Sequence, residues 1–150
     1  MKFIQLSIFI GHNSPGALND ACQVLAKSNI DLSTLTLADT KEFGILRLIT
    51  KDWEKAKMLL SEAGFMVQTT EVVALLVDHK PGGMCGILDT LARNNINVEY
   101  LYAFATPIAG NAVVVFRFDN PDEAIAKLME NGGDNIRFVS PGKIFGTDHA

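Results

Sequence analysis

Two short segments of the sequence carry the residue types best suited to binding a small charged ligand. Residues 11–18 read Gly-His-Asn-Ser-Pro-Gly-Ala-Leu, and residues 78–84 read Asp-His-Lys-Pro-Gly-Gly-Met. A glycine after a proline allows a tight turn and leaves no side chain over the start of a following helix. The first backbone N–H groups of that helix then point outward, where the helix dipole favours an anion such as a carboxylate. Asn13 adds an amide that could hold the ammonium or the carboxylate group of the ligand.

The same turns also allow a purely structural interpretation. Asn13 or Ser14 would cap the helix and Pro15 would lie in its first turn, with no ligand involved. A single Pro-Gly turn favours this structural interpretation. The ligand-binding interpretation gains weight because the turn recurs at the same place in both halves of the chain.

The histidines and cysteines, which could bind a metal or take part in redox chemistry, are isolated from one another in the sequence. His12, His79 and His149 lack the spacing of a metal site, so we expect neither a metal nor a cofactor. Cys22 falls on an apolar helix stripe and is interpreted as a small core residue. Cys85 lies in the first turn of a predicted helix, but no His or second Cys adjoins it, which argues against a redox role. We therefore expect no catalytic residue.

The sequence repeats itself at an offset of 66 residues, the separation between Gly16 and Gly82. Pro15-Gly16 recurs as Pro81-Gly82, and Asn29-Ile30 recurs as Asn95-Ile96. Such internal repetition indicates two similar structural units. We expect one unit at residues 1–70, a second at 71–145 and a tail at 146–150, with no flexible linker between the units.

Each half has the pattern strand, helix, strand, strand, helix, strand. Residues 4–10 alternate apolar and polar side chains, as in a strand with one buried face. Hairpins are predicted at 32–49 and 98–118, and last strands at 65–70 and 135–140. This order predicts an α+β fold class with two tandem ferredoxin-like βαββαβ units, each an antiparallel sheet with two helices on one face.

Apolar stripes and residues typical of helix ends predict where the helices lie. Asp52 and Asn120 are expected at N-caps, and Gly64 and Gly132 at the C′ position. Residues 98–118 are apolar on both strand faces, so we expect the other unit or a second chain to cover the face that the helices leave bare. The predicted buried helix stripes are Leu18, Ala21, Cys22 and Leu25 in the first half, and Met84, Ile87, Leu88 and Leu91 in the second.

Composition and charge narrow the choice of partners. The 150 residues are 48% hydrophobic and 20% charged, which suits a packed core and is too apolar for a disordered chain. A net charge of -4 without a basic stripe argues against nucleic acid and against an anionic membrane surface as partners. The longest apolar runs have strand length and the N-terminus does not read as a signal peptide, so we expect a cytoplasmic protein.

Several of these motifs together resemble the ACT domain, an amino-acid-sensing module attached to enzymes such as phosphoglycerate dehydrogenase and aspartate kinase. In the first half the resemblance is carried by residues 13–18 and by Asn-Ile-Asp-Leu at 29–32. In the second half it is carried by Val-Asp-His-Lys-Pro-Gly at 77–82 and Asn-Ile-Asn-Val at 95–98. The resemblance covers nearly the whole chain as two tandem copies and is closest to the aspartate-kinase type.

This resemblance implies both an arrangement and a site. Two ACT units would join edge to edge into one eight-stranded sheet with the helices on one face. Effectors, usually amino acids, would lie between the first loop of one unit and the start of the second strand of the other. Lys80 stands where the family often has Asn, and a point cation suits a carboxylate, so we expect the two sites to differ. The ligand-binding residues implied in this way are Asn13, Gly16, Ala17, Leu18, Asp31 and Leu32 in the first unit, and Lys80, Gly82, Gly83, Met84, Asn97 and Val98 in the second.

The expected function is binding without chemical conversion. A small-molecule effector, expected to be an amino acid, would stabilise the arrangement that forms its site and so change the activity of a partner enzyme. We also expect a homodimer. The alternative is an assembly or regulatory subunit that acts on a partner enzyme through its sheet surface without a ligand. An acylphosphatase-like enzyme would need an arginine in the first loop to hold phosphate, and neither loop has one.

Overall fold

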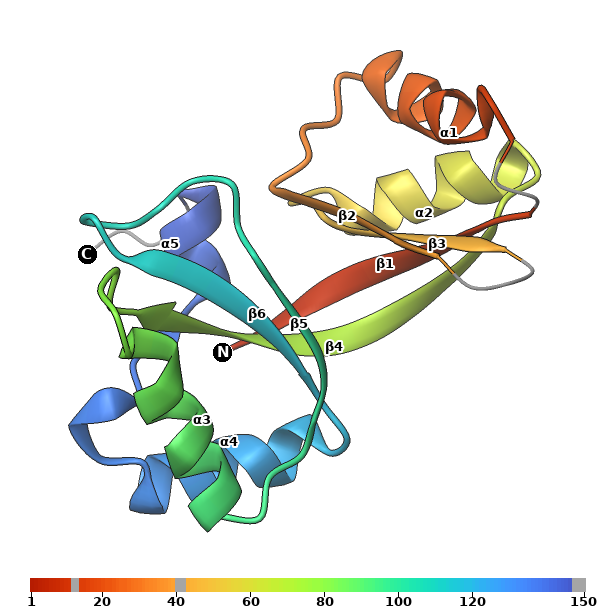
Figure 1. The fold of residues 1–150 in the computed structure, drawn as a ribbon. Helices are drawn as coiled ribbons and strands as arrows, with labels where there is room; N and C mark the ends of the chain where they lie inside the picture. Colours follow the sequence, from red (N-terminus) through yellow and green to blue (C-terminus); the bar gives the residue numbers. More distant parts are fainter. Residues whose placement is uncertain (12–13, 40–42, 147–150) are drawn as a thin grey trace. The chain divides into compact units, whose positions relative to one another are not determined.

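The computed structural model describes residues 1–11, 14–39 and 43–146 (Figure 1). Strands and helices alternate along the chain as the sequence predicts. The strands are β1 (Lys2–Ile10), β2 (Thr34–Asp39), β3 (Gly44–Ile49), β4 (Met66–Val77), β5 (Val98–Ala103), β6 (Ala112–Phe118) and β7 (Phe138–Val139). The helices are α1 (Ala17–Ala26), α2 (Trp53–Glu62), α3 (Gly83–Arg93), α4 (Pro121–Asn131) and α5 (Pro141–Phe145), with a 3-10 turn, η1, at Gly133–Asn135.

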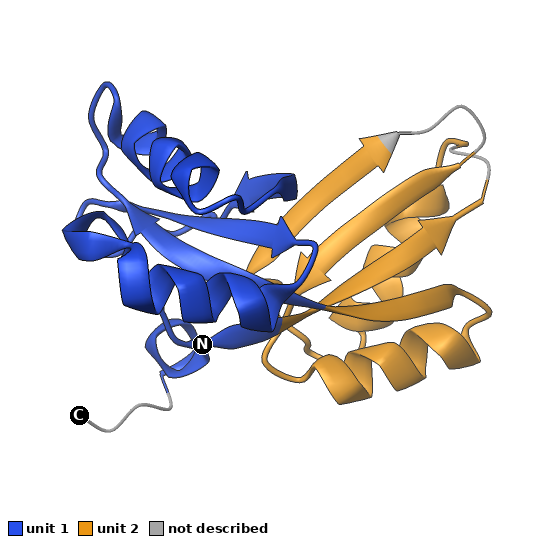
Figure 2. Ribbon diagram, turned by 90° about the horizontal axis from the view of Figure 1, so that it is seen from below, with its two compact units in different colours: residues 1–3, 71–150 blue, residues 4–70 orange. Residues whose placement is uncertain are grey.

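The chain divides into two compact units, coloured separately in Figure 2: an N-terminal unit of residues 4–70 and a C-terminal unit of residues 1–3 and 71–150. In the N-terminal unit the strand order is β2-β3-β1-β4, and β3 pairs antiparallel with both β1 and β2. Helices α1 and α2 cover one face of this sheet. Its core consists of apolar side chains from that face and from both helices, including Leu6, Ile8, Leu46, Leu48, Ala21, Leu25, Ala56 and Leu60.

The C-terminal unit repeats this arrangement. Its strand order is β5-β6-β4-β7, with antiparallel pairing of β6 to β5 and of β4 to both β6 and β7. Helices α3 and α4 pack on one sheet face around a second core, which includes Val73, Leu75, Ile87, Leu91, Val114, Phe116, Ala124 and Leu128. The α+β, ferredoxin-like fold class is therefore confirmed, and α5 is an addition that the sequence pattern did not reveal.

The described residues form seven strands, whereas eight were expected. The difference lies in β4, because the strand predicted at 65–70 and the next apolar run at 72–77 form one continuous strand, Met66–Val77. This segment contains neither glycine nor proline, so nothing in its backbone chemistry interrupts the extended conformation. The last predicted strand is also shorter than expected, since β7 comprises only Phe138–Val139 between η1 and α5.

Each sheet has a second face opposite its helix-packed core, which we call the outer face. Side chains alternate between the two faces along a strand, and residues paired across strands share a face. On the outer face of the N-terminal unit, Ser7 pairs with Arg47, which also pairs with Thr36. On the outer face of the C-terminal unit, Ala74 pairs with Val115, which pairs with Tyr102. The same three strand positions are thus polar in one unit and mainly apolar in the other.

The helix ends combine features that the sequence predicted with others that it did not. Asn29 and Asn95 both adopt positive φ values, 55° and 56°, two or three residues after the ends of α1 and α3, which was not predicted. Asn120 caps α4 as predicted, since its side chain accepts a hydrogen bond from the backbone N–H of Glu123 at 3.2 Å. Asp52 occupies the N-cap of α2, but its side chain makes no capping hydrogen bond there.

Two details differ from the predicted helix pattern. Leu88 was placed on the buried stripe of α3 but is 39% exposed, because the buried face of this helix runs through Ile87, Thr90 and Leu91 instead. Gly132 was expected at the C′ position of α4, where a left-handed conformation is common, but it is the C-cap residue. It remains right-handed at φ -74°, and Gly133 takes the positive φ of 65°.

Candidate functional site

A glycine in the left-handed conformation precedes the first helix of each unit. Gly16 is the N-cap residue of α1 with φ 94°, and Gly82 is the N-cap residue of α3 with φ 84°. A side chain at this φ would be strained, since the left-handed region disfavours a Cβ atom. Nothing lies within 4 Å of where a Cβ would stand at either glycine, so conformation rather than crowding requires glycine at both positions.

Both turns satisfy one backbone donor and leave the following helix start uncapped by a side chain. The N–H of Ala17 donates to the carbonyl oxygen of Ser14 at 3.1 Å, and the N–H of Gly83 donates to that of Lys80 at 3.0 Å. No side chain of the described residues caps α1 or α3. The next N–H groups of a helix have no partner inside the helix. Each turn therefore offers backbone donors and a helix dipole to a small anionic group.

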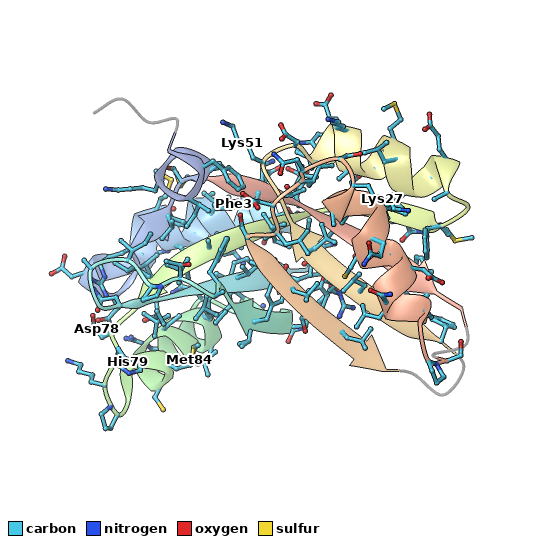
Figure 3. All side chains as sticks on the ribbon, turned by 90° about the horizontal axis from the view of Figure 1, so that it is seen from above. Phe3, Lys27, Lys51, Asp78, His79 and Met84 are labelled. Atoms are coloured by element: carbon cyan, nitrogen blue, oxygen red, sulfur yellow. The ribbon has the colours of Figure 1, made fainter. Side chains whose placement is uncertain are left out.

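The two turns differ in length and in charge. Five residues separate β1 from Gly16, whereas four separate β4 from Gly82. In the shorter turn, Asp78 pairs with Arg137 at 2.5 Å (carboxylate oxygen to guanidinium nitrogen) and with the Nζ of Lys80 at 3.8 Å. Asp78, His79 and Met84, labelled in Figure 3, lie where the chain leaves β4 and enters α3. The cation of Lys80 is thus partly balanced by an acid of its own turn.

The start of α3 also lies unusually close to the end of β4. A Cβ on Gly83 would stand 2.2 Å from the carbonyl oxygen of Asp78, so only glycine fits at this position. Asp78, Gly83 and Arg137 line a cavity of about 240 Å³ together with residues of η1. The involvement of Arg137 could not be found from the sequence, because 59 residues separate it from Asp78 and no local pattern marks the pair.

The implied ligand-binding residues of one unit do not all lie together. In the C-terminal unit, Lys80, Gly82, Gly83 and Met84 lie at or before the start of α3, whereas Asn97 and Val98 follow its other end. Eleven helical residues span about 16 Å. Asn97 instead lines a cavity of about 210 Å³ beside the start of α4. The two groups of residues thus lie at opposite ends of α3 within this unit.

The N-terminal unit shows the same separation. Gly16, Ala17 and Leu18 lie at the start of α1, and Leu18 packs against the core of the unit. Asp31 is exposed and Leu32 is half-buried, and both precede β2 by two or three residues. Asn13 lies outside the described residues, as do His12 and His149. Among the residues that the structure describes, no group of His, Cys, Asp or Glu side chains is arranged to hold a metal ion.

Comparison with known families agrees with this tandem architecture. The family model described as an ACT domain pair matches residues 1–143. The chain therefore belongs to the ACT domain pair family. No curated protein matches the chain. None of the helices in residues 1–11, 14–39 and 43–146 has the length and apolar content needed to cross a membrane.

Solved structures share the fold over most of the chain. Protein BT0572 from Bacteroides thetaiotaomicron is 36% identical with a TM-score of 0.85, and the match covers 97% of this chain and 96% of that one. The ligand-free regulatory subunit of aspartate kinase from Thermus thermophilus is 13% identical with a TM-score of 0.60, covering 86% and 92%. Aspartokinase III from E. coli, in complex with aspartate and ADP, is 18% identical with a TM-score of 0.57, covering 87% of this chain and 32% of that one.

Proposed function

We propose that this protein is a non-catalytic regulatory module that binds an amino acid at the glycine-capped turns of its two ACT units. The observation that carries the proposal is the repetition of one uncommon geometry, a left-handed N-cap glycine at Gly16 and at Gly82. The recurrence of this geometry at the same place in both units supports a shared role for the two turns. The solved relatives include a regulatory subunit of aspartate kinase and an aspartokinase that holds aspartate, which supports an amino-acid effector.

The chemistry of the turns favours the carboxylate end of the effector. Backbone N–H groups and the positive end of a helix dipole attract an anion, and they can do so without a charged side chain. In the proposed site, the second part of the ligand contacts residues near the start of the second strand of another unit, namely Asp31 and Leu32 or Asn97 and Val98. Asp31 would then receive the ligand's ammonium group in one site, while Asn97 offers only an amide in the other.

We further propose that the protein forms a homodimer and acts on a partner enzyme in the cytoplasm. β2 and β5 are edge strands of their units, and an edge strand presents unpaired backbone groups to a partner. Three leucines on these strands are well exposed: Leu35 at 53%, Leu37 at 40% and Leu101 at 41%. Free thiols at Cys22 and Cys85 suit a reducing compartment.

A thermal-shift screen of the twenty amino acids tests the binding proposal. A ligand that binds only the folded state, present at 100 times its Kd, stabilises a protein of this size by roughly 5–10 °C. We expect Gly16→Ala and Gly82→Ala to reduce this shift. Gly64→Ala is the matched control, because Gly64 has a similar φ of 95° and open space around it but follows α2, away from either turn. It should lower the melting temperature without changing the ligand-induced shift.

Two further variants address the side chains of the turns. Asn13→Ala and Lys80→Ala should each weaken the shift, and Lys27→Ala, at an exposed lysine after α1, should not. Undiminished binding in both turn variants and in both glycine variants would show that the effector binds elsewhere.

The alternative function, an assembly subunit without a ligand, is favoured by the exposed leucines of β2 and β5. It requires that no amino acid shifts the melting temperature while a partner enzyme remains bound during purification. Leu35→Lys together with Leu37→Lys would then release the partner enzyme, whereas Gly16→Ala would not.

A further inference from the structure

The C-terminal unit contains a small polar cavity between the start of α3 and the segment that leads from α4 to β7. Its volume of about 240 Å³ is below the roughly 300–1,000 Å³ of pockets for drug-sized molecules, so it suits a small metabolite. All the residues that line it belong to this one unit, so the cavity is complete without any contribution from the N-terminal unit. The polar and small residues among them are Asp78, Gly83, Gly86, Asp134, Asn135 and Arg137.

A longer connection forms one wall of this cavity. Six residues separate α4 from β7, whereas three residues, 63–65, separate α2 from β4 in the N-terminal unit. The longer connection contains η1 and supplies Asp134, Asn135 and Arg137. The shorter one reads Ala-Gly-Phe and contains no charged residue. The charged wall is therefore a feature of the C-terminal unit alone.

The wall presents both a cation and an anion with capacity for a ligand. Within the part of the chain that the structure describes, the guanidinium of Arg137 makes one hydrogen bond, from Nη2 to Oδ1 of Asp78. A guanidinium has five N–H donors, so others remain available to a carboxylate. Asp134 and Asn135 are exposed, and neither side chain forms an ion pair or a hydrogen bond with another described residue. Asp78 thus anchors the cation, and the free carboxylate of Asp134 stands near it in sequence on the same wall.

The opposite wall carries no side chain at two positions one helical turn apart. Gly83 and Gly86 both lie in α3 and line the cavity with backbone. A Cβ on Gly86 would stand 4.0 Å from Nδ2 of Asn135, which is an ordinary contact distance. A methyl group therefore fits at Gly86, whereas a longer side chain would extend into the cavity.

We propose that this cavity binds an amino acid within the C-terminal unit alone, with the ligand's carboxylate on Arg137 and its ammonium group on Asp134. The two opposite charges of the wall match the two charges of a zwitterion, and the amide of Asn135 can donate to one end or accept from the other. That the ligand is an amino acid rests on the function proposed above. The site itself needs no residue of a second unit, so each chain binds one molecule here.

Titration of each of the twenty amino acids into the isotope-labelled full chain, followed by NMR, tests the location and the chemistry of this site. We expect the tightest ligand to shift the amide signals of Gly83, Gly86, Asp134 and Asn135. The amide derivative of that ligand lacks the carboxylate charge, and its N-acetyl derivative lacks the ammonium charge. Each derivative should bind at least about tenfold more weakly than the amino acid.

Two charge variants test the proposed contacts. Arg137→Gln and Asp134→Asn should each raise the Kd about tenfold or more, because each removes a charge-assisted hydrogen bond to the ligand. Arg93→Gln is the matched control for the first, since Arg93 also pairs with an aspartate, Asp89 at 3.1 Å, but lies in the last turn of α3. Glu130→Gln, at an exposed acid of α4, is the control for the second. Both controls should leave the Kd unchanged.

A steric variant tests the cavity without changing its charge. Gly86→Leu should fill the space and abolish detectable binding, while leucine favours the helix more than glycine does. Gly86→Ala is the graded control, because its methyl group meets Asn135 at an ordinary contact distance. It should keep the Kd within about threefold of the wild-type value.

Undiminished affinity in Arg137→Gln or in Gly86→Leu would overturn the proposal. If Arg137→Gln does not fold, Arg137→Lys keeps the charge without the planar fork and should raise the Kd about threefold, and an unchanged Kd would overturn the proposal equally. An amino acid that still binds and shifts the amides around Gly16 would then leave the proposed function standing without this cavity. Absence of binding by all twenty amino acids would contradict both.

Discussion

The two units of this protein share the parts that position their turns and differ on their outer faces. Strand order, the left-handed glycine before the first helix and the left-handed asparagine after it occur in both units. On the outer face, the neighbours Ser7, Arg47 and Thr36 of the N-terminal unit correspond to Ala74, Val115 and Tyr102 of the C-terminal unit. The two units thus share the backbone conformation of the turn and differ in the side chains of their outer faces.

The turns themselves also differ in charge. The C-terminal turn contains Asp78, which pairs with both Arg137 and Lys80, and it is one residue shorter. A ligand carboxylate that approaches Lys80 must therefore compete with Asp78. For the proposed function, we therefore expect the two turns to differ in affinity or selectivity, even though their helix starts have similar geometry.

The largest effect is expected when the outer face of the C-terminal unit receives the charged residue type found on that of the N-terminal unit. Val115→Arg places in the C-terminal unit the residue type that the N-terminal unit carries at Arg47. Val115 is fully buried and its paired neighbours, Ala74 and Tyr102, are not acidic, so they give the new charge no carboxylate partner. We expect a loss of at least about 3 kcal/mol in the free energy of unfolding, measured by urea titration. A near-neutral effect would mean that the outer face of the C-terminal unit admits water. Val115→Ile is the control that keeps the face apolar.

A second comparison uses the glycines that follow α2 and α4. A Cβ on Gly132 would stand 2.4 Å from the carbonyl oxygen of Leu128 and 2.7 Å from Cγ1 of Ile136, whereas Gly64 has open space and only an unfavourable φ. We expect Gly132→Ala to cost about 2–3 kcal/mol through overpacking, and Gly64→Ala to cost about 1 kcal/mol through backbone strain. Thermal unfolding of the two variants side by side measures the difference. Equal losses would show that the end of α4 relaxes around the new methyl group.

The sequence predicted the helix start after each Pro-Gly because local chemistry determines it. Such a start depends on a few consecutive residues, so it can be predicted without knowing the rest of the fold. The left-handed conformation of Asn29 and Asn95 was not predicted, although the sequence shows that Asn-Ile recurs there. The duplicated element order followed from the repeat itself. The residues 95–98 were likewise found by their likeness to 29–32.

The features that the sequence did not predict depend on contacts between distant residues. The pairing of Asp78 with Arg137 spans 59 positions. Two predicted strands form the single strand β4, because no glycine or proline interrupts residues 66–77. The sequence pattern did not show that these two strands are continuous. The exposure of Leu88 follows from the rotation of α3 on its sheet, and an apolar periodicity does not define that rotation closely enough. Whether Asn13 contacts a ligand is a prediction that the described residues do not test.

A subtler test of the outer faces concerns the polar pair of the N-terminal unit. The amide Nε2 of the fully buried Gln5 donates a hydrogen bond to Oγ of Ser7 at 3.2 Å, and Ser7 is 8% exposed. Ser7→Val removes the acceptor, so a buried donor loses this bond, and we expect a cost of about 1–2 kcal/mol in urea unfolding. Ser7→Thr keeps a hydroxyl and is the matched control. If Ser7→Val were stabilising, the outer face of the N-terminal unit would tolerate the apolar chemistry of its counterpart.

The smallest expected effect concerns the starts of α2 and α4, at each of which the sequence predicted an N-cap residue. Asn120 accepts a capping hydrogen bond from the N–H of Glu123 at 3.2 Å, whereas the side chain of Asp52 makes none at its N-cap. Replacing Asn120 by alanine should therefore cost about 1 kcal/mol, a typical value for a lost cap. Replacing Asp52 by alanine should cost only a few tenths of a kcal/mol, because it removes only the favourable interaction of the Asp52 carboxylate with the helix dipole.

Differential scanning calorimetry at low and at high salt distinguishes the two contributions, because salt screens the dipole interaction and leaves the hydrogen bond largely unchanged. A loss at Asp52 as large as that at Asn120 would show that Asp52 caps α2 in solution, and the two helix starts would then be equivalent after all.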